Sequence, residues 1–159
     1  MTQLHRVGLV HHIEVSNFSE YQLSCAHHVS EIPISVNQIE YHPWFTQEPL
    51  VSYCRDADVV VEAAAPLGRT TVFSDPIIRE IAAKYDQSPA VVVLRWAINN
   101  GVAILPKSST REHIINNRDA LTRELSDVDQ HRIDDIERND PVYNFPTRDW
   151  TRQRFGISK

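Results

Sequence analysis

The chain has 159 residues, of which 42% are hydrophobic and 23% charged, and its net charge at pH 7 is −5. This composition is typical of a soluble globular protein, and no apolar run approaches the ~20 residues that a membrane-spanning helix needs. The scattered basic residues argue against a nucleic-acid partner, and two cysteines without a CxxC spacing indicate reduced thiols, as expected in the cytoplasm.

Four short strands are predicted from apolar runs without clean polar alternation, a pattern typical of strands covered on both faces. They lie at residues 12–15, 35–39, 58–63 and 102–105. Helices separate them, and most begin at a recognisable capping pattern. These patterns are Ser19 with Gln22, Thr46 before a helix through about Asp56, Ser74-Asp75-Pro76, Ser88-Pro89, and Ser126 with Asp129 before a helix to about Arg138. The alternation predicts an α/β fold with a parallel sheet.

Residues 101–117 carry the most specific local pattern of the chain. An apolar strand ends at Pro106 and leads into Lys107, two serines and a new helix. Ser109 with Glu112 forms an S-x-x-E capping box, which predicts that this helix begins just after Ser109. A helix N-terminus offers unpaired N–H groups and positive potential, to which Lys107 adds a full charge. The segment predicts either an anion site or an ordinary capped surface helix.

Four motifs in chain order resemble the aldo-keto reductases. They are Val15-Ser16-Asn17-Phe18, the VNQIEYHP run from Val36 to Pro43, Ala65-Pro66-Leu67-Gly68 and Leu105-Pro106-Lys107-Ser108. The resemblance extends from about His12 to Trp150, yet it covers only the second half of the family's barrel. It implies an α/β fold made of the second half of a TIM (β/α)8 barrel, with about four parallel strands. It also implies a partial aldo-keto reductase domain over residues 1–138 and an irregular tail over residues 139–159.

Half a barrel leaves the strands near 12–15 and 102–105 with an unpaired edge. Unpaired edges invite association. We therefore expect self-association, pairing with a separately encoded N-terminal half, or poor solubility.

The resemblance also implies a nicotinamide cofactor at the C-terminal face of the barrel, usually NADP(H), with NAD(H) as the alternative. Ser16, Asn17 and Gln38 match residues that hydrogen-bond the nicotinamide amide, although strand-end turns are an alternative role for the first two. Leu67 matches a backbone contact to the pyrophosphate. The matches around the adenosine and its 2′-phosphate are Lys107, Ser108, Ser109, Thr110, His113 and Asn117.

Four residues depart from the family pattern, among them Asn116, which stands where a glutamate is frequent. Ala64 stands where a tyrosine usually stacks on the nicotinamide. His113 stands where an arginine usually grips the 2′-phosphate through paired hydrogen bonds, which leaves the choice between NADPH and NADH open. Glu14 replaces a glycine and is expected on the same strand face as Ser16, toward the barrel interior.

The resemblance implies an NAD(P)H-dependent oxidoreductase that reduces a small carbonyl substrate, an aldehyde or a ketone, to an alcohol. The motifs that carry the family's catalytic tyrosine, lysine, aspartate and histidine are absent, so no catalytic residue is predicted. Tyr41 and His42 are interpreted as scaffold and as part of the site wall, and Lys84 is expected to point away from its neighbour Tyr85. The alternative function is a non-catalytic half-barrel that binds nucleotide or a partner chain, or a decayed remnant.

No metal site is predicted either. The two adjacent histidine pairs, at 11–12 and 27–28, lack the i, i+4 spacing that places two ligands on one helix face.

Overall fold

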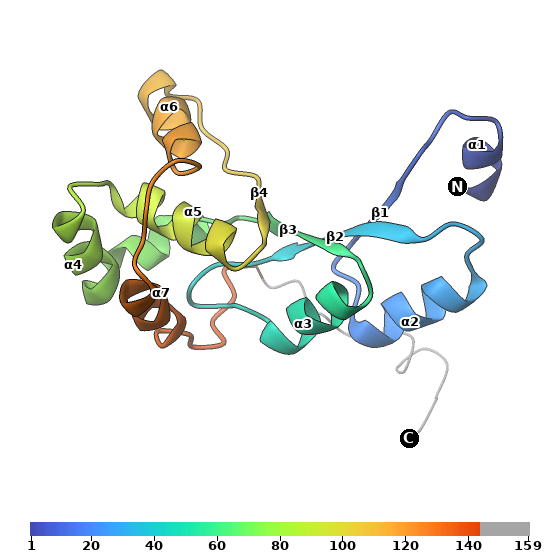
Figure 1. Ribbon diagram of the computed structural model, residues 1–159, viewed down its shortest axis with the longest axis horizontal. Coiled ribbons are helices and arrows are strands. Elements are labelled where there is room, and N and C mark those ends of the chain that lie inside the picture. Colours follow the sequence, from blue (N-terminus) through green and yellow to red (C-terminus); the bar gives the residue numbers. More distant parts are fainter. Residues whose placement is uncertain (144–159) are drawn as a thin grey trace. The chain divides into compact units, whose positions relative to one another are not determined.

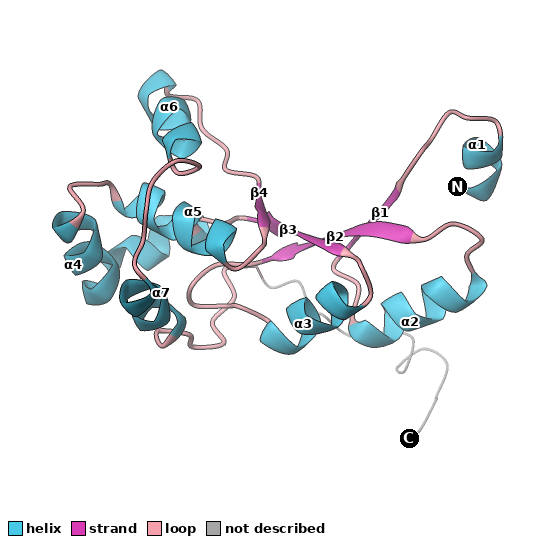
Figure 2. Cartoon of the chain, viewed as in Figure 1, coloured by secondary structure: helices cyan, strands magenta, loops and turns pink. Residues whose placement is uncertain are grey.

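The computed structural model describes residues 1–143, in which four strands alternate with helices (Figures 1 and 2). The strands are β1 (Ile13–Ser16), β2 (Ile34–Glu40), β3 (Val60–Ala64) and β4 (Ala103–Ile104). Their order in the sheet follows the chain, and β1 with β2 and β3 with β4 pair in parallel. The predicted α/β fold with about four parallel strands is confirmed.

Seven α-helices and one 3₁₀ helix lie in the described part of the chain. The α-helices are α1 (Thr2–Arg6), α2 (Glu20–Val29), α3 (Glu48–Asp56), α4 (Pro76–Lys84), α5 (Pro89–Asn99), α6 (Arg111–Asp119) and α7 (Asp127–Asp134), and the 3₁₀ helix is η1 (Gly68–Ser74). Four predicted helix starts are confirmed by a side chain that accepts a hydrogen bond from a first-turn N–H. The capping side chains belong to Ser19, Asp75, Ser88 and Ser126.

Three predicted helix boundaries are wrong: the start of α6, which begins at Arg111, and the two that follow, at α3 and α7. Helix α3 does not begin directly after Thr46, because Gln47 has a left-handed backbone with φ of 51° and its side chain donates to the backbone oxygen of Glu40. Helix α7 ends at Asp134 rather than near Arg138, whose backbone N–H donates to the carbonyl of Trp44 at 3.3 Å. At α3 and at α7, a polar group that was expected to belong to the helix forms a hydrogen bond with a backbone oxygen of residues 40–47 instead.

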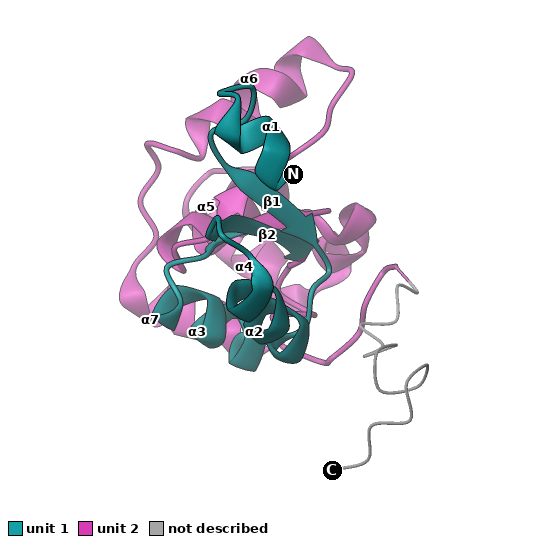
Figure 3. Ribbon diagram, turned by 90° about the vertical axis from the view of Figure 1, so that its right-hand side faces the viewer, with its two compact units in different colours: residues 1–39, 48–61, 144–159 teal, residues 40–47, 62–143 magenta. Residues whose placement is uncertain are grey.

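The chain divides into two compact units, drawn in different colours in Figure 3. Unit 1 contains residues 1–39 and 48–61 of the described chain, with β1, β2, α1, α2 and α3. Helices α2 and α3 lie side by side (Figure 1). The fully buried amide of Asn37 donates to the Phe18 carbonyl at 2.9 Å and accepts from the Phe18 N–H at 3.3 Å. This pair of bonds fastens the turn after β1 to β2.

Unit 2 contains residues 40–47 and 62–143, and α5 lies at its centre. Trp96 of α5 is fully buried, and its ring stacks on Tyr41 with a centroid distance of 5.0 Å and an interplanar angle of 11°. Val91 and Leu94 pack with Ala120, and the partly buried side chain of Leu67 lies against the same cluster. The core of unit 2 thereby holds the loop after β3 beside α5 and the end of α6.

No helix within residues 1–143 is both long and apolar enough to cross a membrane. Residues 139–143, the start of the predicted tail, form neither helix nor strand. The rest of the predicted tail, 144–159, lies outside the described residues, so the boundary at residue 138 stays a prediction.

Candidate cofactor site

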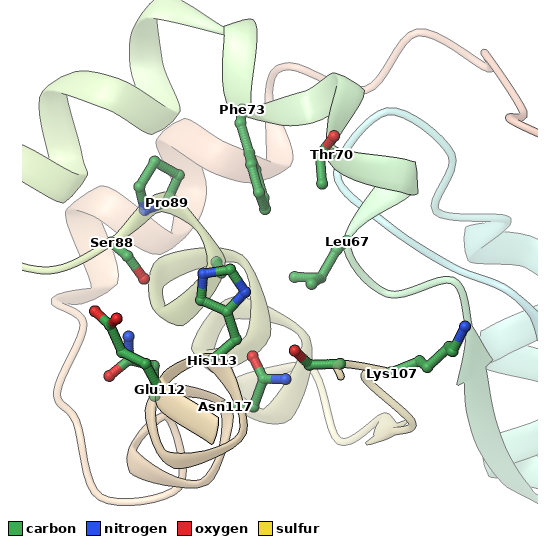
Figure 4. Close-up of a pocket in the computed structure, with 12 residues that line it drawn as sticks. Leu67, Thr70, Phe73, Ser88, Pro89, Lys107, Glu112, His113 and Asn117 are labelled. Carbon is green, nitrogen blue, oxygen red and sulfur yellow. The ribbon is translucent and has the colours of Figure 1, made fainter. Parts of the chain in front are cut away.

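Unit 2 encloses a cavity of about 330 Å³ (Figure 4). Its walls come from the segment after β3, the start of α5, the segment after β4 and the first turns of α6. The lining residues are Leu67, Thr70, Phe73, Ser88, Pro89, Ala90, Lys107, Ser108, Glu112, His113, Asn116 and Asn117. The volume lies at the small end of ligand pockets, about 300–1,000 Å³. It suits a nucleoside better than a whole dinucleotide.

The cavity brings together most of the adenosine and phosphate residues predicted from the sequence: Leu67, Lys107, Ser108, His113 and Asn117. The predicted Ser109 and Thr110 do not line it and are exposed. In Figure 4, Lys107 lies at one end of the cavity, Glu112 lies beside Ser88 at the other, and the His113 ring and the Asn117 amide lie between them. The apolar wall and the amide and imidazole edges fit a purine nucleoside.

The start of α6 differs from the predicted capping box. Thr110, not Ser109, precedes the first helical residue, and its side chain makes no capping bond. Ser108 takes this role in part, because its Oγ accepts from the Thr110 N–H at 3.1 Å. The helix begins one residue late, so Glu112 occupies the second helical position and cannot complete the reciprocal bond of a capping box.

The loop that follows β3 is tightly wound. Ala65, Gly68, Arg69 and Thr70 all have left-handed backbones, with φ of 51°, 50°, 49° and 70°. At Gly68 a Cβ atom would lie 2.9 Å from a methyl group of Val72, so only glycine fits there. Such strained conformations cluster at ligand-binding turns. The winding turns Thr70 as well as the predicted Leu67 toward the cavity.

Sequence reasoning missed several cavity residues. Thr70 and Phe73 belong to η1, whose left-handed residues have no local sequence preference that marks them. Ser88 and Pro89 could have been found, because their S-P helix start resembles the anion-binding layout already recognised after β4. Their proximity to α6 comes from tertiary packing.

Ser16, Asn17 and Gln38 lie together in unit 1. Ser16 ends β1 and is in register with Gln38 of β2. Asn17 donates its backbone N–H to the Gln38 carbonyl at 2.8 Å and its side-chain amide to Ser16 Oγ at 2.9 Å. Its φ of 57° is the conformation of a strand-end turn, which agrees with the alternative role. Glu14 lies on the same strand face as Ser16, and both side chains are exposed.

The rings of Tyr41 and His42 are buried, as expected for scaffold residues. Tyr41 is 1% exposed, and its hydroxyl accepts from the Asn100 side-chain amide at 3.0 Å. His42 is fully buried, and its Nε2 lies 2.9 Å from a carboxylate oxygen of Glu40. Their hydroxyl and imidazole groups contact protein atoms in the core.

Lys84 and Tyr85 converge on one carboxylate, contrary to our expectation. Lys84 Nζ lies 2.6 Å and the Tyr85 hydroxyl 2.8 Å from Asp129 Oδ2. The Tyr85 hydroxyl also accepts from the Ser126 backbone N–H at 3.0 Å. A hydroxyl that donates to one protein group and accepts from another is occupied as an anchor for α7, not as a proton donor.

A search of the described residues finds no group of three histidine, cysteine, aspartate or glutamate side chains that could hold a metal ion.

Parallel strands that alternate with helices, with a largely apolar cavity beyond the carboxyl ends of β3 and β4, define an α/β protein of the barrel type. A model of the aldo/keto reductase family matches residues 1–138. The chain belongs to this family. It is 35% identical over 142 residues to glyoxal reductase of Bacillus subtilis, covering 89% of this chain and 51% of the relative. It is 36% identical to aldose reductase C of Dictyostelium discoideum, covering 87% and 44%.

Solved structures agree with the sequence matches. The Bombyx mori aldo-keto reductase in complex with NADP superposes with a TM-score of 0.85 at 30% identity, covering 95% of this chain and 52% of that one. The aldose reductase of Schistosoma japonicum gives a TM-score of 0.86 at 30% identity, covering 92% and 48%. The chain thus spans about half the length of the relatives it matches, and its fold is the second half of their TIM barrel.

Proposed function

We propose that this chain is the cofactor-holding half of an NAD(P)H-dependent reductase that converts aldehydes or ketones to alcohols in the cytoplasm. Family membership supports the reaction class. The observation that carries the proposal is the cavity of unit 2, because residues matched to the cofactor's adenosine end line one pocket. The same cavity supports NADP(H) or NAD(H) as the ligand class.

Different cavity residues suit different parts of the cofactor. Lys107 and Ser108 supply a positive charge and a hydroxyl, which suit a phosphate on the ribose. His113 and Asn117 offer a ring face and an amide to the base, against the apolar side chain of Leu67. In unit 1, Ser16 and Gln38 would hydrogen-bond the cofactor amide. When bound, the cofactor supplies the hydride that reduces a carbonyl carbon.

No residue of this chain is matched to the acid that would protonate the carbonyl oxygen. Within residues 1–143, Tyr41 is buried and Tyr85 is hydrogen-bonded on both sides. We propose that turnover requires an N-terminal half-barrel that brings the acid group. The same observation favours the second candidate function, a half-barrel that binds nucleotide without turnover when it is alone.

Calorimetric titration with NADPH and with NADH tests the nucleotide site. We expect saturable binding of NADPH, weakened about tenfold or more by Lys107→Ala, since a hydrogen bond to a charged group contributes about 1.5–3 kcal/mol. Arg118→Ala is the matched control, because it removes an exposed cation of α6 that does not line the cavity.

A second variant tests the ribose phosphate. His113→Arg should strengthen binding of NADPH but not of NADH, because a guanidinium binds a phosphate through two parallel hydrogen bonds. If a folded wild-type chain binds neither cofactor, the proposal fails, and that result supports the alternative that the chain is a decayed remnant.

A further inference from the structure

The segment just before residue 144 is fastened to the turn after β2. The backbone N–H groups of Val142 and Tyr143 both donate to the carboxylate of Glu40, the latter at 3.1 Å. Glu40 is only 5% exposed, so its charge is stabilised by these bonds and by His42. At the other end of the segment, the Arg138 guanidinium lies 4.3 Å from the Trp44 ring centroid and pairs with Asp75. We call residues 138–143 the strap.

The aromatic ring of Tyr143, in the strap, stacks on Arg69, which belongs to the loop between β3 and α4. The guanidinium carbon of Arg69 lies 4.3 Å from the ring centroid of Tyr143. Stacking occupies the face of a guanidinium and leaves the N–H donors along its edge available. Within residues 1–143, no carboxylate forms an ion pair with Arg69, whose side chain is exposed. Arg69 therefore carries a full positive charge, and the stacked ring of Tyr143 sets the orientation of its guanidinium group.

The backbone of the loop places Arg69 next to residues that line the cavity. Leu67 and Thr70, on either side of Arg69 in the sequence, both line the cavity. The Thr70 N–H donates to the Leu67 carbonyl at 2.7 Å, and Thr71 Oγ1 donates to the Gly68 carbonyl at 2.6 Å. These bonds close the loop into a single tight turn. The base of the Arg69 side chain is therefore held directly beside the cavity.

The charge of the cavity itself is close to balanced. Its lining contains one ammonium group, on Lys107, and one carboxylate, on Glu112. A dinucleotide brings two further negative charges on its pyrophosphate, and anions bind where cations offset them. Arg69 is the additional cation that the loop supplies.

We infer that Arg69 is a pyrophosphate-binding residue of this chain, and that Tyr143 holds its guanidinium ready beside the cavity. The inference rests on the proposed nucleotide site and adds a residue to it. The strap is thereby a positioning element, because Glu40 holds the backbone of Tyr143 and Tyr143 holds Arg69.

The test compares a ligand that has a pyrophosphate with one that lacks it. NADP⁺ and adenosine 2′-monophosphate share the base, the ribose and the 2′-phosphate. We expect Arg69→Gln to weaken NADP⁺ binding about tenfold in calorimetric titration and to leave the monophosphate unchanged. Arg123→Gln, the loss of an exposed arginine that does not line the cavity, is the matched control and should change neither.

Two tyrosine variants test the positioning role. Tyr143→Phe keeps the ring face and should bind NADP⁺ as the wild type does. Tyr143→Leu removes the ring and should weaken NADP⁺ binding severalfold, again without affecting the monophosphate.

The outcomes separate this inference from the proposed function. Unchanged NADP⁺ binding in Arg69→Gln overturns the role of Arg69 while the nucleotide site stands. An equal loss for both ligands also overturns it, because Arg69 would then act only on the shape of the cavity. If the folded wild-type chain binds neither ligand, the proposed function and this inference fail together.

Discussion

At the scale of single residues, His42 is a fully buried ionisable group of unit 2. Burial lowers the pKa of His42, and the Glu40 carboxylate only partly offsets that effect. The carboxylate accepts a hydrogen bond from Nε2–H, so Nδ1 is left as a buried atom without a partner among residues 1–143. A second proton on Nδ1 would have no acceptor. The folded state therefore keeps this imidazole neutral.

This neutrality makes folding sensitive to mild acid. Because the pKa of His42 is lower in the folded chain than in the unfolded chain, its contribution is fully present above about pH 6.5. As the pH falls below that value, the unfolded chain binds a proton that the folded chain does not, and stability declines. Between pH 7 and pH 5 we expect wild type to lose more stability than His42→Gln does.

Urea unfolding followed by circular dichroism at several pH values measures this difference. His131→Gln removes an exposed histidine of α7 and should keep the wild-type slope. Parallel pH curves for wild type and His42→Gln would contradict the assignment.

At the scale of elements, a single carboxylate secures α7 against α4. Burial alone would raise the pKa of Asp129, but hydrogen bonds from Lys84, Tyr85, Ser126 and Arg132 outweigh it and lower the pKa far below its ordinary value. Asp129 is 1% exposed, and Ser126 is also the N-cap of α7. Its contribution to stability is present above about pH 4 and is lost as the pH falls further.

Asp129→Asn should therefore destabilise the chain by about 1–3 kcal/mol, the usual cost of leaving buried partners of a charged group unsatisfied. Asp127→Asn makes the same charge change at an exposed position of α7 and should stay within about 0.5 kcal/mol of wild type. Thermal unfolding of the three proteins at pH 7 provides the comparison. Equal midpoints for both variants would show that the Asp129 cluster adds little.

Local sequence predicted the elements well where the information is local. Ser19, Ser88 and Ser126 cap their helices as expected, since a side-chain cap depends on residues only two or three positions away. The α7 end was missed because the carbonyl of Trp44 takes the N–H of Arg138, a contact between distant segments.

The candidate site shows the same division. The Pro106-Lys107-Ser108 and Pro66-Leu67-Gly68 motifs led to cavity residues, because they are short and contiguous. Phe73 and the Arg69–Tyr143 pair could not be predicted, since packing alone brings them to the loop.

At the scale of the whole molecule, the strands at the two ends of the sheet order, β1 and β4, each have one described partner. Exposed apolar side chains lie close to both in sequence: Leu9 is 74% exposed before β1, and Leu105 is 48% exposed directly after β4. Unpaired parallel edges with apolar neighbours favour association.

We therefore expect the purified 18.3 kDa chain to associate, with light scattering giving masses above that of a monomer. Leu105→Lys should reduce this association, because a lysine beside β4 blocks edge pairing. Val128→Lys makes the same change at an exposed apolar residue of α7 and should have no such effect. A monodisperse wild-type monomer with a cooperative melt would contradict the expectation.

The hydrogen bonds between Glu40 and the strap have a consequence for biosynthesis. Glu40 and Val142 are separated by 102 residues, so the amides that satisfy this buried carboxylate are made long after it. At a translation rate of about 5–20 residues per second, the delay is roughly 5–20 s. During that time the turn after β2 has been synthesised but its final partners have not. The carboxylate must stay hydrated until the last part of unit 2 arrives, which makes closure of the strap a late step in the folding of unit 2.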